Sequence, residues 1–107
     1  MLLLCSFLPV WGAADKITRL YNYPNPFQAS GGETTTVAFD YENNSGSDYS
    51  LNYYIYIYDL AGYRVLIRKQ SANVTTSNPN RITFTWNGHN DKGKRVAPGI
   101  YFIKIVT

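Results

Sequence analysis

The polar residues with the greatest capacity for chemistry are gathered in one turn near the C-terminus. His89 is the sole histidine of the chain, and Asn87, Asn90 and Asp91 beside it offer oxygen atoms. A general base needs a nucleophile or a bound water within reach, and no partner of that kind accompanies His89. The oxygens could suit calcium, but the spacing has no closing bidentate Glu, and turns use Asn, Asp and Gly anyway. We therefore predict no catalytic residue and no metal ligand here.

Other signatures of catalysis are also missing from the sequence. The seven acidic residues are dispersed, so no carboxylate pair suited to glycoside hydrolysis is evident. Gly31-Gly32 is not followed by the Lys and helix of a phosphate-binding loop. We predict that the protein is not an enzyme and needs no cofactor.

Three tyrosines at alternate positions are the best candidate for a binding surface. Tyr54, Tyr56 and Tyr58 lie on one face of a predicted strand. The other face, which we assign to the core, carries Leu51, Tyr53, Ile55 and Ile57. An outward row of tyrosines can stack on sugar rings or anchor a protein partner, because each ring offers contact area plus a hydroxyl. The alternative is that neighbouring segments cover the rings or pair with them across the sheet.

Alternating patterns in the rest of the chain predict the strands that would position this row. The predicted strands cover residues 17–22, 34–41, 51–58, 63–69, 81–86 and 101–106. Within 63–69, Val65 and Ile67 are predicted to face the core, and 71–80 is predicted to be a long polar loop. Short strands separated by turn signals are typical of a β-sandwich, so we predict an all-β fold of about seven strands.

Size and charge narrow the class of protein further. A chain of 107 residues fits one domain, and its ten Tyr and five Phe favour strands. The net charge of +3 is small, and Lys and Arg are too scattered to indicate a nucleic-acid surface. We predict a single domain over residues 15–107 that binds no nucleic acid.

The first fourteen residues differ from the rest. An apolar run over residues 2–10 is followed by Gly12-Ala13-Ala14, the small residues that a signal peptidase reads. We predict that Met1–Ala14 is a signal peptide; the alternatives are a clipped gene start or the tail of an upstream domain. Cys5 is the single cysteine, so the mature domain would have no disulfide. The run is too short to span a bilayer, and we predict no membrane span in the mature chain.

Five blocks of residues occur in an order that resembles one superfamily. They are Tyr23-Pro24-Asn25-Pro26-Phe27, the strand at 35–41, Ile57-Tyr58-Asp59-Leu60-Ala61-Gly62, Trp86-Asn87-Gly88 with Asp91-Lys92-Gly93, and Gly99-Ile100-Tyr101. Together they resemble the immunoglobulin-like domain shared by flagellar hook-capping proteins (FlgD type) and by the C-terminal sorting domains of type IX secretion substrates. The likeness covers about residues 17–106.

The resemblance implies an immunoglobulin-like antiparallel β-sandwich of about seven strands, without the disulfide of antibody domains. Phe27 is expected to plug one end of the sandwich and Trp86 to cap the core, where a large ring buries much area. Gly62 and Gly93 are expected to serve turns that need a positive φ. The full set expected to have structural roles is Tyr23, Pro24, Asn25, Pro26, Phe27, Asp59, Gly62, Trp86, Gly88, Asp91, Gly93, Gly99 and Tyr101.

The resemblance also implies a non-catalytic role in the bacterial cell envelope. The expected partner is a protein, either the secretion machinery or a neighbouring envelope domain. Sorting domains of this family usually continue after the Gly-x-Tyr strand with a further strand and a basic tail, and we expect this terminal strand to be missing after Thr107. The alternative function is a small carbohydrate-binding module that uses Tyr54, Tyr56 and Tyr58.

Overall fold

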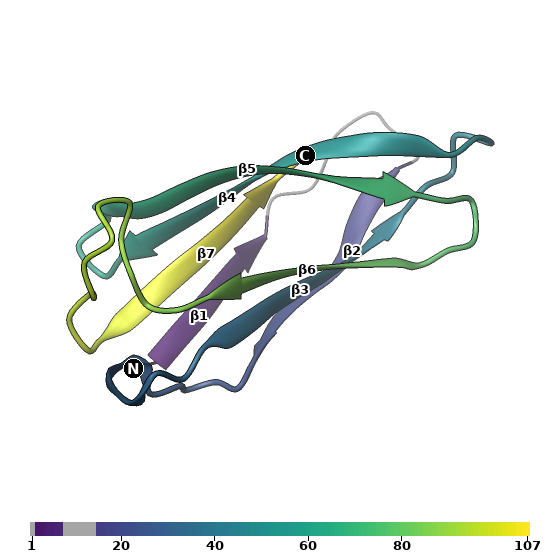
Figure 1. Cartoon of the computed structure of the whole chain (residues 1–107). Helices are drawn as coiled ribbons and strands as arrows, with labels where there is room; N and C mark the ends of the chain where they lie inside the picture. Colours follow the sequence, from purple (N-terminus) through teal and green to yellow (C-terminus); the bar gives the residue numbers. More distant parts are fainter. Residues whose placement is uncertain (1, 8–14) are drawn as a thin grey trace.

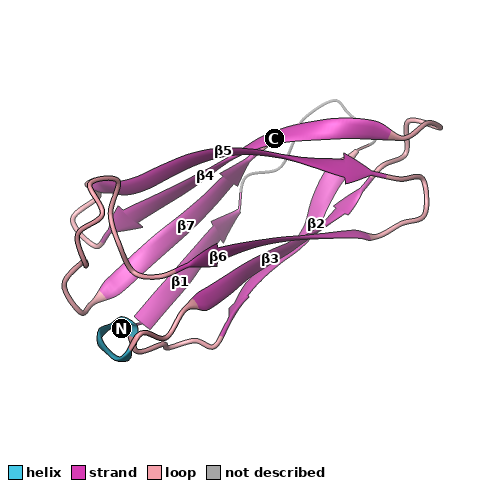
Figure 2. Cartoon of the chain, viewed as in Figure 1, coloured by secondary structure: helices cyan, strands magenta, loops and turns pink. Residues whose placement is uncertain are grey.

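Two β-sheets packed face to face make up the protein (Figure 1). The computed structural model describes residues 2–7 and 15–107, the first range by its backbone. Helical structure within these ranges is limited to the 3-10 turn η1, and no helix there is long and apolar enough to cross a membrane (Figure 2). The elements are β1 (Leu2–Phe7), β2 (Lys16–Tyr23), η1 (Ala29–Gly31), β3 (Thr35–Glu42), β4 (Tyr49–Asp59), β5 (Arg64–Val74), β6 (Asn80–Trp86) and β7 (Ile100–Val106).

Each sheet is built around a strand that is paired on both sides. One sheet has the order β1-β7-β4-β5, and the other has the order β2-β3-β6. β4 is antiparallel to both β5 and β7, and β3 is antiparallel to both β2 and β6. The predicted β-sandwich of about seven strands is therefore confirmed, and β4, which carries the tyrosine row, lies inside its sheet.

Alternate residues of the strands point between the sheets and form the core. Ile55 and Ile57 of β4 and Ile103 of β7 are completely buried. Phe39 of β3 meets Tyr53 of β4 edge to face, with 5.2 Å between the ring centroids. Because burial of each such side chain stabilises the fold by roughly 1.5–3 kcal/mol, this layer is the main source of cohesion in a domain without a disulfide.

Trp86 closes one end of the core. Its ring lies edge to face with Phe27 at 5.7 Å and with Tyr101 at 5.5 Å between centroids. The indole Nε1 donates a hydrogen bond to the His89 carbonyl at 2.9 Å, and the Tyr101 hydroxyl donates one to the Ala97 carbonyl. Phe27 and Trp86 are at most 2% exposed. Three blocks that are far apart in the sequence thus meet at one indole ring.

The inward face of β5 differs from the prediction. Val65 and Ile67 are half-buried, whereas Leu66 between them is 2% exposed and lies opposite Ile57 in the register. The register with β4 therefore determines which residue of β5 faces the core, and the pairing becomes irregular just beyond this point, between Ile57 and Tyr58. The predicted polar loop at 71–80 is also wrong in its first half, because β5 continues to Val74, which is fully buried.

An additional strand comes from the segment that we expect to be a signal peptide. β1 pairs with β7 in parallel, from Leu2 opposite Ile100 to Phe7 opposite Ile105. It lies along the edge of the four-stranded sheet (Figure 1). The remainder of the expected signal peptide, including Gly12-Ala13-Ala14, lies outside the described residues.

A hydrogen-bonded cluster fixes the chain just before β2, at the end of the sandwich opposite Trp86. The Tyr49 hydroxyl donates to Asp15 Oδ2 at 2.5 Å and lies 2.8 Å from the Tyr41 hydroxyl. Asp15 Oδ1 also accepts a bond from the Asn44 amide at 2.7 Å. Burial, followed by the hydrogen bonds to Asp15 and Tyr41, raises the pKa of Tyr49 well above its ordinary value of 10.0.

The closure of the core by Trp86 gives a first prediction. Trp86→Ala should lower the free energy of unfolding by about 3–5 kcal/mol, because it leaves a cavity between Phe27 and Tyr101. Urea denaturation followed by circular dichroism measures the change. Leu60→Ala, at a side chain that is 66% exposed, is the control and should stay within about 0.5 kcal/mol of the wild type. Equal losses in the two variants would contradict the capping role.

The raised pKa of Tyr49 gives a second prediction. Above pH 10.0 the unfolded chain loses the Tyr49 proton while the folded chain keeps it, so the folded state should become less stable as the pH rises. Urea denaturation at about pH 8 and about pH 11 should show a smaller loss for Tyr49→Phe than for the wild type. Tyr63→Phe, at a residue 74% exposed, should show the wild-type loss. Identical losses in the wild type and Tyr49→Phe would contradict this prediction.

Candidate functional site

The outer face of the four-stranded sheet carries the three tyrosines singled out in the sequence. Tyr54, Tyr56 and Tyr58 alternate along β4 with the buried Ile55 and Ile57. Tyr54 is 36% exposed, and the other two rings are half-buried. The row therefore faces away from the core, in the middle of a sheet.

The three rings contact one another along the strand. Tyr56 and Tyr58 are stacked, with centroids 6.1 Å apart and ring planes within 8° of parallel. Tyr54 and Tyr56 lie 6.0 Å apart and are tilted by 31°. Stacked neighbours turn their ring faces toward each other, so ring edges and hydroxyls make up much of what the row presents to a partner.

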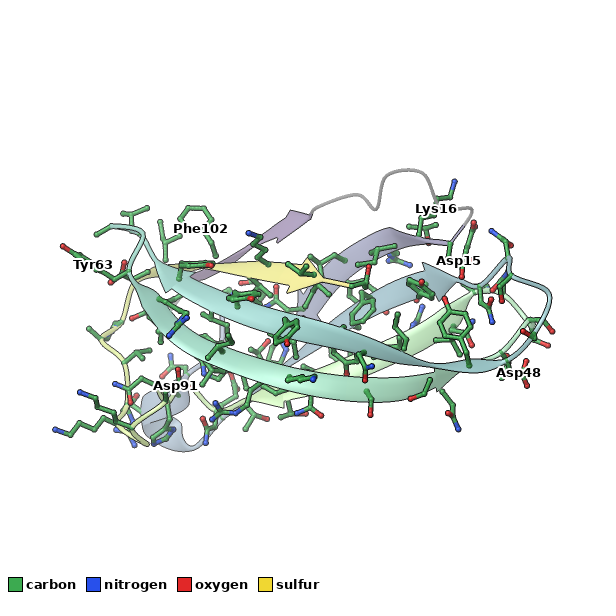
Figure 3. The ribbon with its side chains drawn as sticks, turned by 90° about the horizontal axis from the view of Figure 1, so that it is seen from above. Asp15, Lys16, Asp48, Tyr63, Asp91 and Phe102 are labelled. Carbon is green, nitrogen blue, oxygen red and sulfur yellow. The ribbon has the colours of Figure 1, made fainter. Side chains whose placement is uncertain are left out.

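Residues of the adjacent strands complete this surface, and the sequence did not single them out. Lys69 of β5 and Lys104 of β7 are the register partners of Tyr54 and Tyr56, and their Nζ atoms lie 6.0 and 5.7 Å from the two ring centroids. These distances fit cation–π contacts. Phe102 of β7, half-buried, lies opposite Tyr58 (Figure 3). We define the tyrosine face as Tyr54, Tyr56, Tyr58, Lys69, Phe102 and Lys104.

The tyrosine face has the composition of a binding surface. It combines four half-buried or exposed aromatic rings with two cationic groups, and none of its six residues is acidic. Its groups are contact, stacking and hydrogen-bonding groups; they include no nucleophile paired with a base. Such a surface favours recognition of a partner that presents apolar and acidic groups.

The turn that follows Trp86 uses its polar atoms internally. Asn87 Oδ1 accepts a bond from the His89 amide, and Asn90 Oδ1 accepts bonds from the amides of Lys92 and Lys94, all at 2.9–3.0 Å. The His89 Nδ1 atom lies 3.2 Å from the Asn87 carbonyl oxygen. Among the side chains of residues 15–107, no group of three or more His, Cys, Asp or Glu could hold a metal ion. The side-chain oxygens of this turn thus stabilise its backbone.

Asp91 joins this turn to the edge of β5. Its amide donates to the Val65 carbonyl at 3.2 Å, and its carboxylate accepts from the Ile67 amide at 3.3 Å and from Arg68 Nη1 at 2.6 Å. Gly93, at a φ of +76°, lets the chain turn back after this contact. The turn therefore lies along the outer edge of β5 and bonds to backbone groups that no described neighbouring strand pairs with. A surface hollow of about 540 Å³ beside it is lined by residues that include Leu66, Arg68, Trp86, His89, Asn90 and Asp91.

The other residues singled out in the sequence lie in corners and turns. The Pro24 carbonyl accepts a bond from Thr35 Oγ1 at 2.9 Å, which ties the Tyr23–Phe27 corner to the start of β3. Asp59 Oδ1 accepts a bond from the Tyr63 amide at 2.9 Å across the β4–β5 turn, where Gly62 has a φ of +91°. Gly88 accepts a bond from the Val96 amide through its carbonyl, and Gly99 precedes β7. They position the strands around the tyrosine face without contributing to it.

Comparisons of the chain with models of protein families, with curated proteins and with solved structures found no match in any of the three. The function is therefore inferred from the surfaces of the chain itself.

The role of Asp91 gives a third prediction. Asp91→Ala should lower the free energy of unfolding by about 1 kcal/mol and speed hydrogen exchange at the Ile67 amide, because the turn is released from β5. Asp48→Ala is a matched control at the opposite end of the sandwich, where Asp48 Oδ1 accepts a bond from the Thr76 amide (Figure 3). The control should leave exchange at Ile67 unchanged. Unchanged Ile67 exchange in Asp91→Ala would show that the turn holds β5 by other means.

Proposed function

We propose that this chain is a non-catalytic, secreted interaction module of the bacterial cell envelope, with an immunoglobulin-like sandwich that binds a protein partner through the tyrosine face. The observation that carries the proposal is a row of three contacting tyrosines flanked by two lysines on the outer face of the sheet. Tyrosine is enriched where protein interfaces concentrate their binding energy, since it loses little side-chain entropy on binding.

The surroundings of the row support a protein partner. Lys69 and Lys104 add positive charge without a neighbouring acid among the residues of the tyrosine face, which favours a partner with acidic groups at the rim of the contact. The rings are held by their own contacts and by a paired strand, so ordering them on binding costs little entropy.

The resemblance stated above suggests what this partner does. If the chain acts as a type IX sorting domain, the exported domain is recognised through its folded surface at the outer-membrane machinery. If it acts as a hook-cap domain does, it packs against a neighbouring envelope subunit. Both functions need an exposed, rigid surface for protein contact, and the tyrosine face supplies the best candidate among the described residues.

Carbohydrate binding is the alternative function for the same row. Sugar rings stack on open aromatic faces, whereas Tyr56 and Tyr58 are stacked on each other and Lys104 lies over Tyr56. This geometry favours the protein partner over the sugar.

A secretion assay tests the proposal. A reporter enzyme with its own signal peptide is fused in front of residues 15–107 and expressed in a bacterium with a type IX system. If the tyrosine face is sufficient for sorting without the terminal strand, the reporter reaches the cell surface. We then expect about tenfold less surface reporter for the triple variant Tyr54→Thr, Tyr56→Thr and Tyr58→Thr, since threonine keeps the strand preference but removes the rings. Enzyme activity on intact and on lysed cells measures the distribution.

The opposite sheet provides a matched control. Tyr21 and Tyr23 of β2 also stack, at 5.9 Å between centroids, on the strand that forms an edge of the three-stranded sheet. Their double replacement by Thr should leave surface delivery unchanged. A wild-type fusion that stays in the periplasm would contradict the sorting function, and equal losses in both sets of variants would contradict the assignment to the tyrosine face.

A glycan array tests the alternative function, carbohydrate binding. Binding of the full chain to plant or bacterial glycans that disappears in Tyr56→Ala would support the carbohydrate module. No binding across the array is the outcome that we expect from the stacked geometry.

A further inference from the structure

The outer edge of β7 is poorly protected against pairing with another strand. The strand reads Ile-Tyr-Phe-Ile-Lys-Ile-Val, so Lys104 is its single charged residue and it contains no proline. Natural sheets protect exposed edges with charged residues, proline, bulges or covering loops, because a flat apolar edge pairs with any available strand. By these criteria β7 needs a covering strand.

The edges at β5 and β2 carry such protection. The turn through Asp91 hydrogen-bonds to β5 at Val65 and Ile67, and β5 continues with Arg68 and Lys69. β2 contains an irregularity in its register between Ile17 and Arg19 and has two basic residues, Lys16 and Arg19. The β7 edge is therefore exceptional among these three in depending on a strand rather than on loops or charge.

β1 shows what kind of strand fits this edge. Its six residues run parallel to β7, with Leu3, Cys5 and Phe7 opposite Tyr101, Ile103 and Ile105. These three residues of β7 are at most 5% exposed, whereas Phe102 and Lys104 between them are half-buried. Because side chains of a strand alternate between faces, a fitting strand needs apolar residues at every second position. The positions opposite Phe102 and Lys104 tolerate polar residues.

The start of β2 is held in place without β1. The hydrogen-bonded ladder of β1 runs along β7, whereas the next strand, β2, belongs to the other sheet. Asp15 is fixed independently by Tyr49 and Asn44, so the start of β2 does not rely on β1 for its position. Cleavage after Ala14, expected from the sequence, would remove β1 and leave the β7 edge open.

We propose that the edge of β7 is an acceptor site for an extended apolar strand of another protein, which binds parallel to β7 in the place that β1 occupies. The partner segment has apolar residues at alternate positions and gains from an acidic residue opposite Lys104, since opposite charges across a strand pair attract. This site lies on the edge of the sheet and shares Lys104 with the tyrosine face.

A peptide-exchange experiment with the folded full chain tests the proposal. A protease recognition sequence is placed between Phe7 and Asp15, the chain is folded, and it is then cut so that β1 is held without a covalent link. The probe is a fluorescent peptide of residues 1–7, and its anisotropy reports binding. We expect saturable binding to the cut chain and at least about tenfold weaker binding to the uncut chain, where β1 competes at high effective concentration.

Two variants of the peptide test the register. Cys5→Glu places a charge opposite the fully buried Ile103 and should weaken binding by about tenfold or more. Ser6→Glu places the same charge one residue along, opposite Lys104, and should bind at least as tightly as the original peptide.

Three outcomes would overturn the proposal. The first is the absence of binding to the cut chain. The second is equal binding of the two glutamate peptides, which would show a non-specific apolar contact. The third is a cut chain that dimerises and takes up no peptide, as light scattering would reveal, because a second copy would then be the occupant of the edge.

Discussion

The register of β4 between β5 and β7 is the constraint on which the rest of the structure depends. Ile55 and Ile57 face the core, and Tyr54, Tyr56 and Tyr58 face outward, because successive residues of a strand point to opposite sides. A shift of one residue would exchange the two sets and place three hydroxyls in the core. The burial of the isoleucines thus holds the tyrosine row in its outward position, so the core residues and the tyrosine row are two faces of one strand.

The polar residues near Trp86 illustrate how turn chemistry can resemble a functional site. Asn87, Asn90 and Asp91 offer oxygens at close spacing, yet each of these oxygens accepts hydrogen bonds from backbone amides. The turn that they stabilise is hydrogen-bonded to β5 through the Asp91 amide. Its His89 carbonyl accepts the hydrogen bond of the Trp86 indole. A backbone amide left without a partner is costly, which explains why these side chains serve the fold.

The outer face of the four-stranded sheet and its β7 edge suit two different modes of binding. The tyrosine face is rigid, because its rings contact one another and sit on a paired strand. The β7 edge is apolar and is covered by a strand that comes from the beginning of the chain. Packing a face requires complementary side chains, whereas pairing an edge requires mainly backbone hydrogen bonds. The two surfaces therefore suit partners that bind in different ways.

Local alternation was enough to predict strands at β2 to β7, the sandwich and the outward side of the tyrosine row, because a strand with aliphatic residues on one side has a clear core face. It did not predict β1, which lies within the expected signal peptide. It failed at β5, where Val65, Leu66 and Ile67 are all apolar and the alternation offers no choice between faces. The pairing of Leu66 with the buried Ile57 of β4 makes that choice.

The sequence by itself determined the class of fold, the turns at Gly62 and Gly93 and the tyrosines of β4, since these depend on local period and backbone conformation. Only the tertiary structure brought Lys69, Lys104 and Phe102 beside those tyrosines and Phe27 and Tyr101 around Trp86. It also placed β1 on the edge of β7, because contacts between distant segments follow from strand order and register, which local patterns do not encode.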